Sequence, residues 1–332
     1  PRAISIWAAV GAVAAAAGPP VGGLLVEASW RLVFLVNVPV GISAVYFAAR
    51  ILRESRDPDQ TRPDLPGTVI FAASIGLLAL GLVKAPTWGW GSASTLGAVA
   101  ASVAGLAAFW VRCRTHPSPV VEPSMLRVRS FALAGIASLL FSTAFGAMLL
   151  AGVLFMTGVW HYSVLKAGLS LAPGPAMAAT FATISGRLPL RIAPGVLAAT
   201  GMGVFACGVG VWLWRIGVHP SYASEMLPGQ ILTGIGVGLA LPTLAGAATA
   251  SLPPARFATG SAVFTMSRQL GFVLGVAILV AVLGSVDGAD PVAPFHAAWT
   301  FIVVVLLGGA TSALAIGPVS GRAPVVAAEL AA

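Results

Sequence analysis

Ten apolar segments, each about long enough to cross a bilayer, make up most of this 332-residue chain. A transmembrane α-helix needs about 20 predominantly apolar residues. Within hydrocarbon, a helix also satisfies its own backbone hydrogen bonds. The sequence therefore predicts an all-α fold, a polytopic transmembrane bundle of ten helices. The segments cover residues 4–26, 32–51, 65–84, 95–111, 131–156, 167–185, 195–214, 226–248, 261–283 and 295–316.

The composition excludes an ordinary soluble domain. Charged residues make up 8% of the chain and apolar residues 58%, whereas soluble domains carry about 25% charged residues. The net charge of +8 does not indicate a nucleic-acid partner, because membrane proteins collect Lys and Arg on their cytoplasmic loops.

The distribution of Lys and Arg predicts the orientation. If the first segment enters from the cytoplasm, all of the 18 basic residues except Arg31, Lys84, Lys166 and Arg215 lie on the cytoplasmic side. This asymmetry is typical of correctly oriented membrane proteins. We therefore expect a multi-pass protein of the plasma (inner) membrane with a cytoplasmic C-terminus.

The sequence offers little chemistry for catalysis. The four histidines and two cysteines are isolated, so no spacing indicates a metal site, and we expect no cofactor. No Ser/His/Asp set, carboxylate pair or phosphate loop appears, which argues against an enzyme. The ten carboxylates fall in loops, tails or at helix ends, although a proton relay normally uses a titratable group within the membrane.

The first segment contains the stretch Gly18-Pro19-Pro20-Val21-Gly22-Gly23. Gly11, Gly18 and Gly22 are spaced by seven and four residues, so they share one helical face, and small faces let membrane helices approach closely. Pro19 and Pro20 favour a bend. We expect this helix to pack on segment 167–185; the alternative is an ordinary kinked packing helix.

The motifs of this chain resemble those of a known family. Gly18-Pro19-x-x-Gly22-Gly23 resembles the antiporter motif of the major facilitator superfamily, although Ala14 stands where that motif usually has Gly. Trp30-Arg31-x-x-Phe34-x-x-Asn37-x-Pro39-x-Gly41 follows it, and Arg268-Gln269-Leu270-Gly271 comes near the end. The order of these motifs is similar to that in the fourteen-helix drug:proton antiporter branch.

The resemblance implies a domain organisation. The ten helices would correspond to helices five to fourteen of the family, with the first four lacking. Residues 1–52 would form the last two helices of the N-terminal bundle, and 53–130 a two-helix insert with cytoplasmic loops. Residues 131–320 would form the six-helix C-terminal bundle, and 321–332 a cytoplasmic tail. The start at Pro1-Arg2 indicates a chain cut just before a transmembrane segment.

The resemblance also implies site residues. In the family, the first and fourth helices of each bundle line the central cavity, which implicates Phe141, Phe145, Met148, Phe155, Met156, Gln230, Thr233 and Thr243. The alternative is that these side chains face lipid or are packed. Trp30, Arg31, Asn37 and Pro39 would pin the outer loop and second helix.

Two places are candidate gates. Arg187 and Arg191 lie in a degenerate copy of a Gly-Arg-Leu-x-Asp-Arg loop, in which Leu190 occupies the acidic position. Arg268 and Gln269 would open the ninth helix at the inner surface, as a gate or as an interfacial anchor.

The function implied is proton-coupled efflux of small hydrophobic or cationic compounds, of the multidrug type, by alternating access. The expected partners are such a substrate, protons and the lipid bilayer, and we expect a monomer. The alternative is a truncated or non-transporting membrane module that is inactive without the first four helices.

Overall fold

The fold was obtained from a computed structural model, which describes residues 17–51, 64–186, 192–250, 252–253, 256–284 and 290–317. Within these ranges the chain forms helices and loops and no strand. Residues 17–28 are helical. The other elements are α2 (Leu32–Leu35), α3 (Asn37–Ile51), α4 (Leu65–Trp88), α5 (Ala93–Thr115), α6 (Pro123–Leu126), α7 (Arg129–Gly158), α8 (Val164–Leu171), α9 (Pro173–Ser185), α10 (Pro194–Arg215), η1 (Tyr222–Met226), α11 (Leu227–Ala250), α12 (Phe257–Leu283) and α13 (Ala293–Leu314).

The prediction of an all-α membrane bundle is confirmed. In the described ranges, eight helical stretches are long and apolar enough to cross a membrane. The predicted segment 4–26 is described only from residue 17. The predicted segment 167–185 is divided into α8 and α9, because Pro173 and Pro175 carry no amide hydrogen for a continuous helix.

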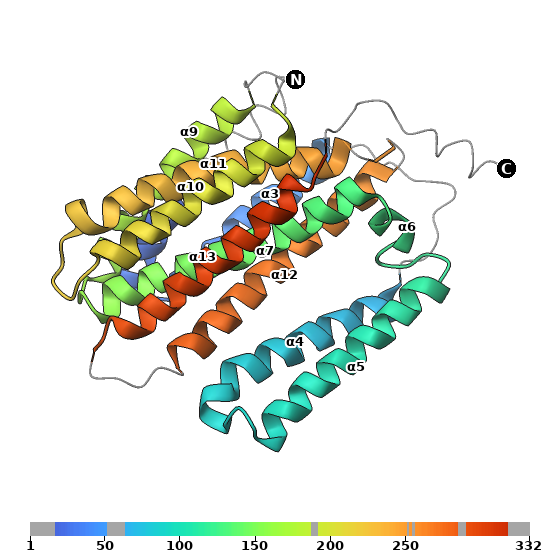
Figure 1. The fold of residues 1–332 in the computed structure, drawn as a ribbon, viewed down its shortest axis with the longest axis horizontal. Coiled ribbons are helices and arrows are strands. Elements are labelled where there is room, and N and C mark those ends of the chain that lie inside the picture. The colour runs from blue at the N-terminus through green and yellow to red at the C-terminus, as the bar shows by residue number, and fades with distance from the viewer. Residues whose placement is uncertain are drawn as a thin grey trace.

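The helices from α7 onward form one interlocked bundle. α7 lies against α12, α13 and α11, while α10 packs on α11 and α13, and α9 packs on α11. Its core contains the fully buried side chains of Phe141, Phe155, Phe205 and Trp299. Figure 1 shows these helices side by side as one body.

Glycines let α10 and α11 approach backbone to backbone. A Cβ at Gly201 would lie 2.8 Å from the Gly236 carbonyl oxygen, and one at Gly208 would lie 2.6 Å from the Gly229 carbonyl oxygen. Close approach of this kind replaces the hydrophobic driving force that lipid does not supply.

α4 and α5 form a hairpin that stands apart from the bundle and meets it through α12 (Figure 1). Small residues line the contact within the hairpin, since a Cβ at Gly81 would lie 3.3 Å from Ala98. At its arginine-rich end, Asp64 caps α4 by accepting the Gly67 amide at 2.9 Å. The same carboxylate accepts from Arg112 Nε at 2.7 Å, which joins the two helices.

Residues 17–51 contact the rest of the described chain much less. α2 and α3 contain no buried residue, although together they form one of the eight candidate spans. The Asn37 side-chain amide donates to the Val33 carbonyl at 3.0 Å, which joins α3 to α2.

Candidate functional site

The helix at residues 17–28 meets the bundle at α8. A Cβ at Gly168 would lie only 2.5 Å from the Pro19 carbonyl oxygen, and one at Gly23 would lie 3.1 Å from the Leu165 Cα. Pro19 and Gly23 are four residues apart and so share a helical face. We call Pro19, Gly23, Leu165 and Gly168 the seam. Residues of the predicted antiporter motif therefore lie against the helix that we expected them to contact.

The face that makes this contact differs from the one we expected. A Cβ at Gly18 or Gly22 would have no heavy atom within 4 Å in the described chain, and Gly11 lies outside the described residues. The contact face is rotated by one residue, about 100° on a helix, from the Gly18–Gly22 stripe. Because Gly168 lies so close to the Pro19 carbonyl, the helix at 17–28 turns the face with Pro19 and Gly23 toward α8.

Most predicted cavity residues on α7 lie inside the bundle core. Phe141, Met148, Phe155 and Met156 are all buried, because α11, α12 and α13 cover most faces of α7. The Phe155 ring packs 5.1 to 5.3 Å from the rings of Phe295, Trp160 and Trp299. In this conformation these four side chains are packed rather than open to a cavity.

Phe145 is the predicted α7 residue that is only partly buried. Its ring makes an edge contact with Phe272 at 5.6 Å and lies 5.9 Å from Phe141. A half-covered aromatic ring can still contact an apolar ligand. Phe145 therefore stays the cavity candidate on this helix.

The predicted polar residues on α11 differ in exposure. Gln230 and Thr233 are buried, and the Thr233 hydroxyl donates to the Gln230 carbonyl at 2.9 Å. Thr243 is partly buried and donates to the Leu239 carbonyl at 2.6 Å. Both threonines thus satisfy their hydroxyls within their own helix.

Arg268 lies much deeper than the expected inner surface. α12 begins at Phe257, so Arg268 is eleven residues inside it, or about 16 Å at 1.5 Å per residue. Arg268 is partly buried and Gln269 is exposed. The ion pairs among the described residues join Asp64 to Arg112 and Glu122 to Arg256, so neither includes Arg268. Its placement at a helix opening was wrong, because the predicted segment 261–283 already contains it and α12 begins still earlier.

The other predicted gate and loop residues are placed as follows. Arg187 and Arg191 lie outside the described residues. Trp30 is exposed, and the Arg31 guanidinium stacks 4.9 Å from its ring centroid. The Pro39 carbonyl accepts from the Ser43 hydroxyl at 2.8 Å.

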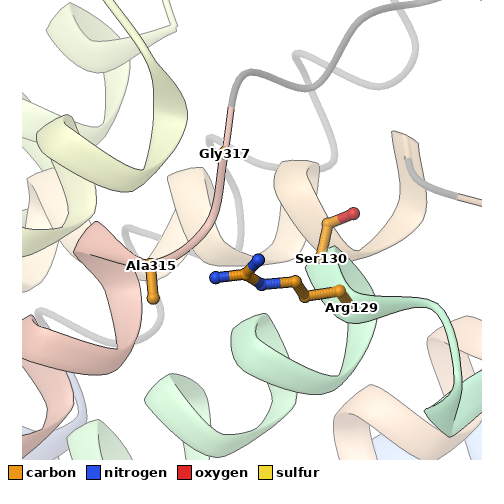
Figure 2. A pocket seen from close by; sticks show the side chains of 4 residues that line it. All are labelled: Arg129, Ser130, Ala315 and Gly317. Carbon is orange, nitrogen blue, oxygen red and sulfur yellow. The ribbon is translucent and has the colours of Figure 1, made fainter.

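Two shallow hollows lie at the arginine-rich end of the helices. One, of about 250 Å³, is lined by Arg129, Ser130, Ala315 and Gly317; Figure 2 shows the Arg129 guanidinium extending from the start of α7 toward the end of α13. The other is lined by residues of α5 and the segment 123–127. Neither includes a predicted cavity residue.

Four of the described acids, Asp64, Glu122, Glu225 and Asp290, make contacts near helix ends. The Glu225 carboxylate accepts the Gly217 amide at 3.0 Å. Desolvation acts to raise the pKa of Asp64, but hydrogen bonds from Gly67 and Arg112 outweigh it, so this pKa lies below its ordinary value of 3.8. Among the described residues, no group of three or more His, Cys, Asp or Glu could hold a metal ion.

Comparison with known proteins identifies the family. The model of the Major Facilitator Superfamily matches residues 1–276. The chain belongs to this superfamily. Its members are membrane transporters, and this membership confirms the resemblance of the motifs.

Several relatives are named for export or for drug resistance. The chain is 31% identical over 288 residues to multidrug resistance protein Stp of Mycobacterium tuberculosis, covering 86% of this chain and 52% of that protein. It is 32% identical over 304 residues to the cephamycin export protein CmcT of Amycolatopsis lactamdurans, covering 87% and 60%. It is 31% identical to the tetracenomycin C resistance and export protein of Streptomyces glaucescens, covering 85% and 53%. The chain thus spans about half the length of the relatives it matches.

Sequence analysis missed two residues that the structure brings to this region. Gly168 forms the tightest contact of the seam, and Tyr222 donates a hydrogen bond to the Ser170 carbonyl at 2.7 Å. The pair Pro173 and Pro175 was the available signal, because a proline pair within a membrane segment leaves carbonyls that neighbouring helices can satisfy.

Proposed function

We propose that this chain is the major part of a proton-coupled exporter of small hydrophobic or cationic compounds. In this proposal, residues 17–51 belong to one moving unit and the six-helix unit at 131–320 is the other. α4 and α5 form an insert between them. The two units rock against each other and expose the substrate site alternately to the two sides of the membrane.

The observation that carries the proposal is the seam. Residues 17–28 touch the second unit through the carbonyl of Pro19 and the glycines Gly23 and Gly168. A contact of this kind, made without long side chains, can close tightly and open without leaving an apolar side chain unpaired. The relatives named for export of cephamycin and tetracenomycin C, and the one named for multidrug resistance, support the same function.

The positions of two partly buried residues, Arg268 and Phe145, support a site between the units. Arg268 is near the middle of α12, and both it and Phe145 remain partly uncovered in the described chain. Buried charges in a membrane face a partner or an aqueous cavity. We assign Arg268 and Gln269 to the gate and Phe145 to the cavity wall. The protein acts as a monomer in the inner membrane, with its arginine-rich end and C-terminus in the cytoplasm.

The test is ethidium efflux from cells that express the complete reading frame. The proposal predicts efflux above the level of an empty vector, and abolition of this efflux by a protonophore. In inside-out vesicles, ethidium should dissipate an imposed pH gradient. Efflux that persists without a proton gradient would contradict the coupling. Absence of efflux for a panel of hydrophobic cations and neutral antibiotics would favour a non-transporting membrane module.

A further inference from the structure

The most informative hydrogen bonds outside the seam lie where α8 ends and α9 begins. A proline at position 173 or 175 cannot donate to the carbonyl four residues earlier, which affects the carbonyls of Leu169 and Leu171. The Ala172 amide donates to the Leu169 carbonyl at 3.2 Å, as a tighter turn does. The helix is therefore divided at a point of weakened backbone bonding.

The two halves of this divided helix have different partners. α8 meets residues 17–28 at Gly168. α9 is fixed to α11, since a Cβ at Gly238 would clash with the Ala178 carbonyl and one at Gly234 would clash with the Gly174 carbonyl. The break thus separates the part that contacts the first unit from the part that belongs to α11.

Tyr222 spans the break. Its hydroxyl lies 2.7 Å from the Ser170 carbonyl oxygen and 3.1 Å from Gln230 Oε1. Both of these oxygens are acceptors and the hydroxyl has a single hydrogen, so the two acceptors share one donor. The Gln230 side chain also covers Gly174, where a Cβ would lie 3.4 Å from Gln230 Cγ.

This sharing makes the two contacts interdependent. If Gln230 turns away from Tyr222, the hydroxyl hydrogen is free to bond fully to Ser170. If Gln230 Oε1 competes more strongly, the carbonyl at the break loses its donor. The strength of each bond in such a network depends on the other.

We propose that Tyr222 is a positioning residue that links Gln230 on α11 to the seam through the break between α8 and α9. A transported compound that carries a hydrogen-bond donor binds Gln230 Oε1 and releases Tyr222 to Ser170. The change at the break then alters how Gly168 meets Pro19. The inference rests on the proposed export function. It names the residues through which binding of a compound at Gln230 changes the contact between the two units.

The test combines transport kinetics with hydrogen exchange on the complete reading frame. Ethidium is the probe because its amino groups are hydrogen-bond donors. Tyr222→Phe removes only the hydroxyl. The matched control is Tyr162→Phe, since the Tyr162 hydroxyl has no hydrogen-bond partner among the described residues and its ring contact with Lys166 is kept.

For Tyr222→Phe we expect kcat for ethidium to fall about tenfold while KM changes less than about twofold, the pattern of a lost step rather than lost binding. In the wild type, ethidium should change amide exchange in residues 17–28 and 164–176. In Tyr222→Phe this response should vanish, although ethidium still binds. Tyr162→Phe should match the wild type in all three measurements.

A double-mutant cycle tests whether Tyr222 acts through Gln230. Gln230→Leu should give the same loss of kcat, and the double variant should be no worse than either single variant, because residues that act through each other are not additive. Additive losses would overturn the link. An ethidium response at residues 17–28 that survives in Tyr222→Phe would overturn it as well.

The failure of the export function would look different. If the wild type exports neither ethidium nor other compounds, amide exchange measured without ligand still tests the role of Tyr222 at the break. Tyr222→Phe should then raise exchange at residues 169–176 relative to Tyr162→Phe, because the Ser170 carbonyl loses its donor. Gln230→Leu should lower this exchange or leave it unchanged, because the hydroxyl then bonds to Ser170 alone. Unchanged exchange in Tyr222→Phe would overturn the role of Tyr222 at the break, whatever the protein transports.

Discussion

The stretch formed by α2 and α3 and the stretch formed by η1 and α11 are both long and apolar enough to cross a bilayer, but their packing against the described residues differs. No residue of α3 is buried, whereas α11 is buried on two sides, with Gly229 and Gly236 against α10 and Gly234 and Gly238 against α9. A Cβ at Gly41, the glycine of α3, would meet no heavy atom of the described chain within 4 Å. Hydropathy therefore predicts that a helix enters the membrane, whereas the glycines at its contacts show where it packs closely.

The strongest test of this contrast gives the same bulk to both helices. Gly236→Val should abolish the folded protein, because a Cβ there would overlap the backbone of α10 at Gly201 and Phe205; overpacking usually costs about 1–3 kcal/mol or more. Gly41→Val should leave folding unchanged. The measurement is monodispersity and thermal unfolding in detergent. Equal effects at both positions would contradict the contrast between the helices.

The next largest effect on efflux should come from α12, the helix of the bundle that contacts the α4–α5 hairpin (Figure 1). Arg268→Leu should lower efflux by about tenfold or more, because intramembrane charges are retained for function. The thermal midpoint should stay the same or rise, since the described chain offers this charge no ion pair. Arg129→Leu, at the exposed start of α7, is the control and should change neither. A large loss of stability in Arg268→Leu would show a structural role instead.

A moderate, pH-dependent effect is expected in the hairpin. Asp64→Asn removes the partner of Arg112 and weakens the cap of α4, so it should lower the thermal midpoint. The lowered pKa of Asp64 means that its contribution is complete above its ordinary value of 3.8 and is lost as the pH falls through the lowered value. The difference in midpoint between wild type and variant should therefore narrow below about pH 4. A difference that stays constant into strong acid would exclude the ion pair.

The smallest effect on stability is expected at the start of α3, which has no buried residue. Asn37→Ala removes one hydrogen bond to the Val33 carbonyl at an exposed position, which is worth about 1 kcal/mol or less. The thermal midpoint should hardly change, while exchange of the amides between α2 and α3 should rise. A large fall in the midpoint would mean that this turn carries more of the stability than its exposure indicates.

The sequence predicted the membrane helices well because hydropathy is a local property. It placed the helix starts less well, since α12 begins at Phe257, before the apolar segment. Arg268, which already lies inside the segment predicted at 261–283, is near the middle of this helix. It also predicted that the first helix would meet segment 167–185.

The face of each helix was the harder prediction. Gly18 and Gly22 have the better spacing, but Pro19 and Gly23 make the contact, because the position of a partner carbonyl depends on the tertiary fold. The burial of Phe141 and Phe155 likewise depends on how α11, α12 and α13 surround α7. The periodic pattern of residues on one helix predicts neither the position of a partner carbonyl nor the arrangement of the neighbouring helices.

The most direct test of the central claim, that the units meet and move at the seam, compares Gly168→Ala with Gly22→Ala at equal membrane levels. A Cβ at residue 168 would lie 2.5 Å from the Pro19 carbonyl oxygen, whereas one at residue 22 would meet no heavy atom of the described chain within 4 Å. We predict ethidium efflux reduced about tenfold or more in Gly168→Ala and within about twofold of wild type in Gly22→Ala, since overpacking acts only where atoms already touch. Equal efflux from the two variants, or a greater loss in Gly22→Ala, would contradict the claim.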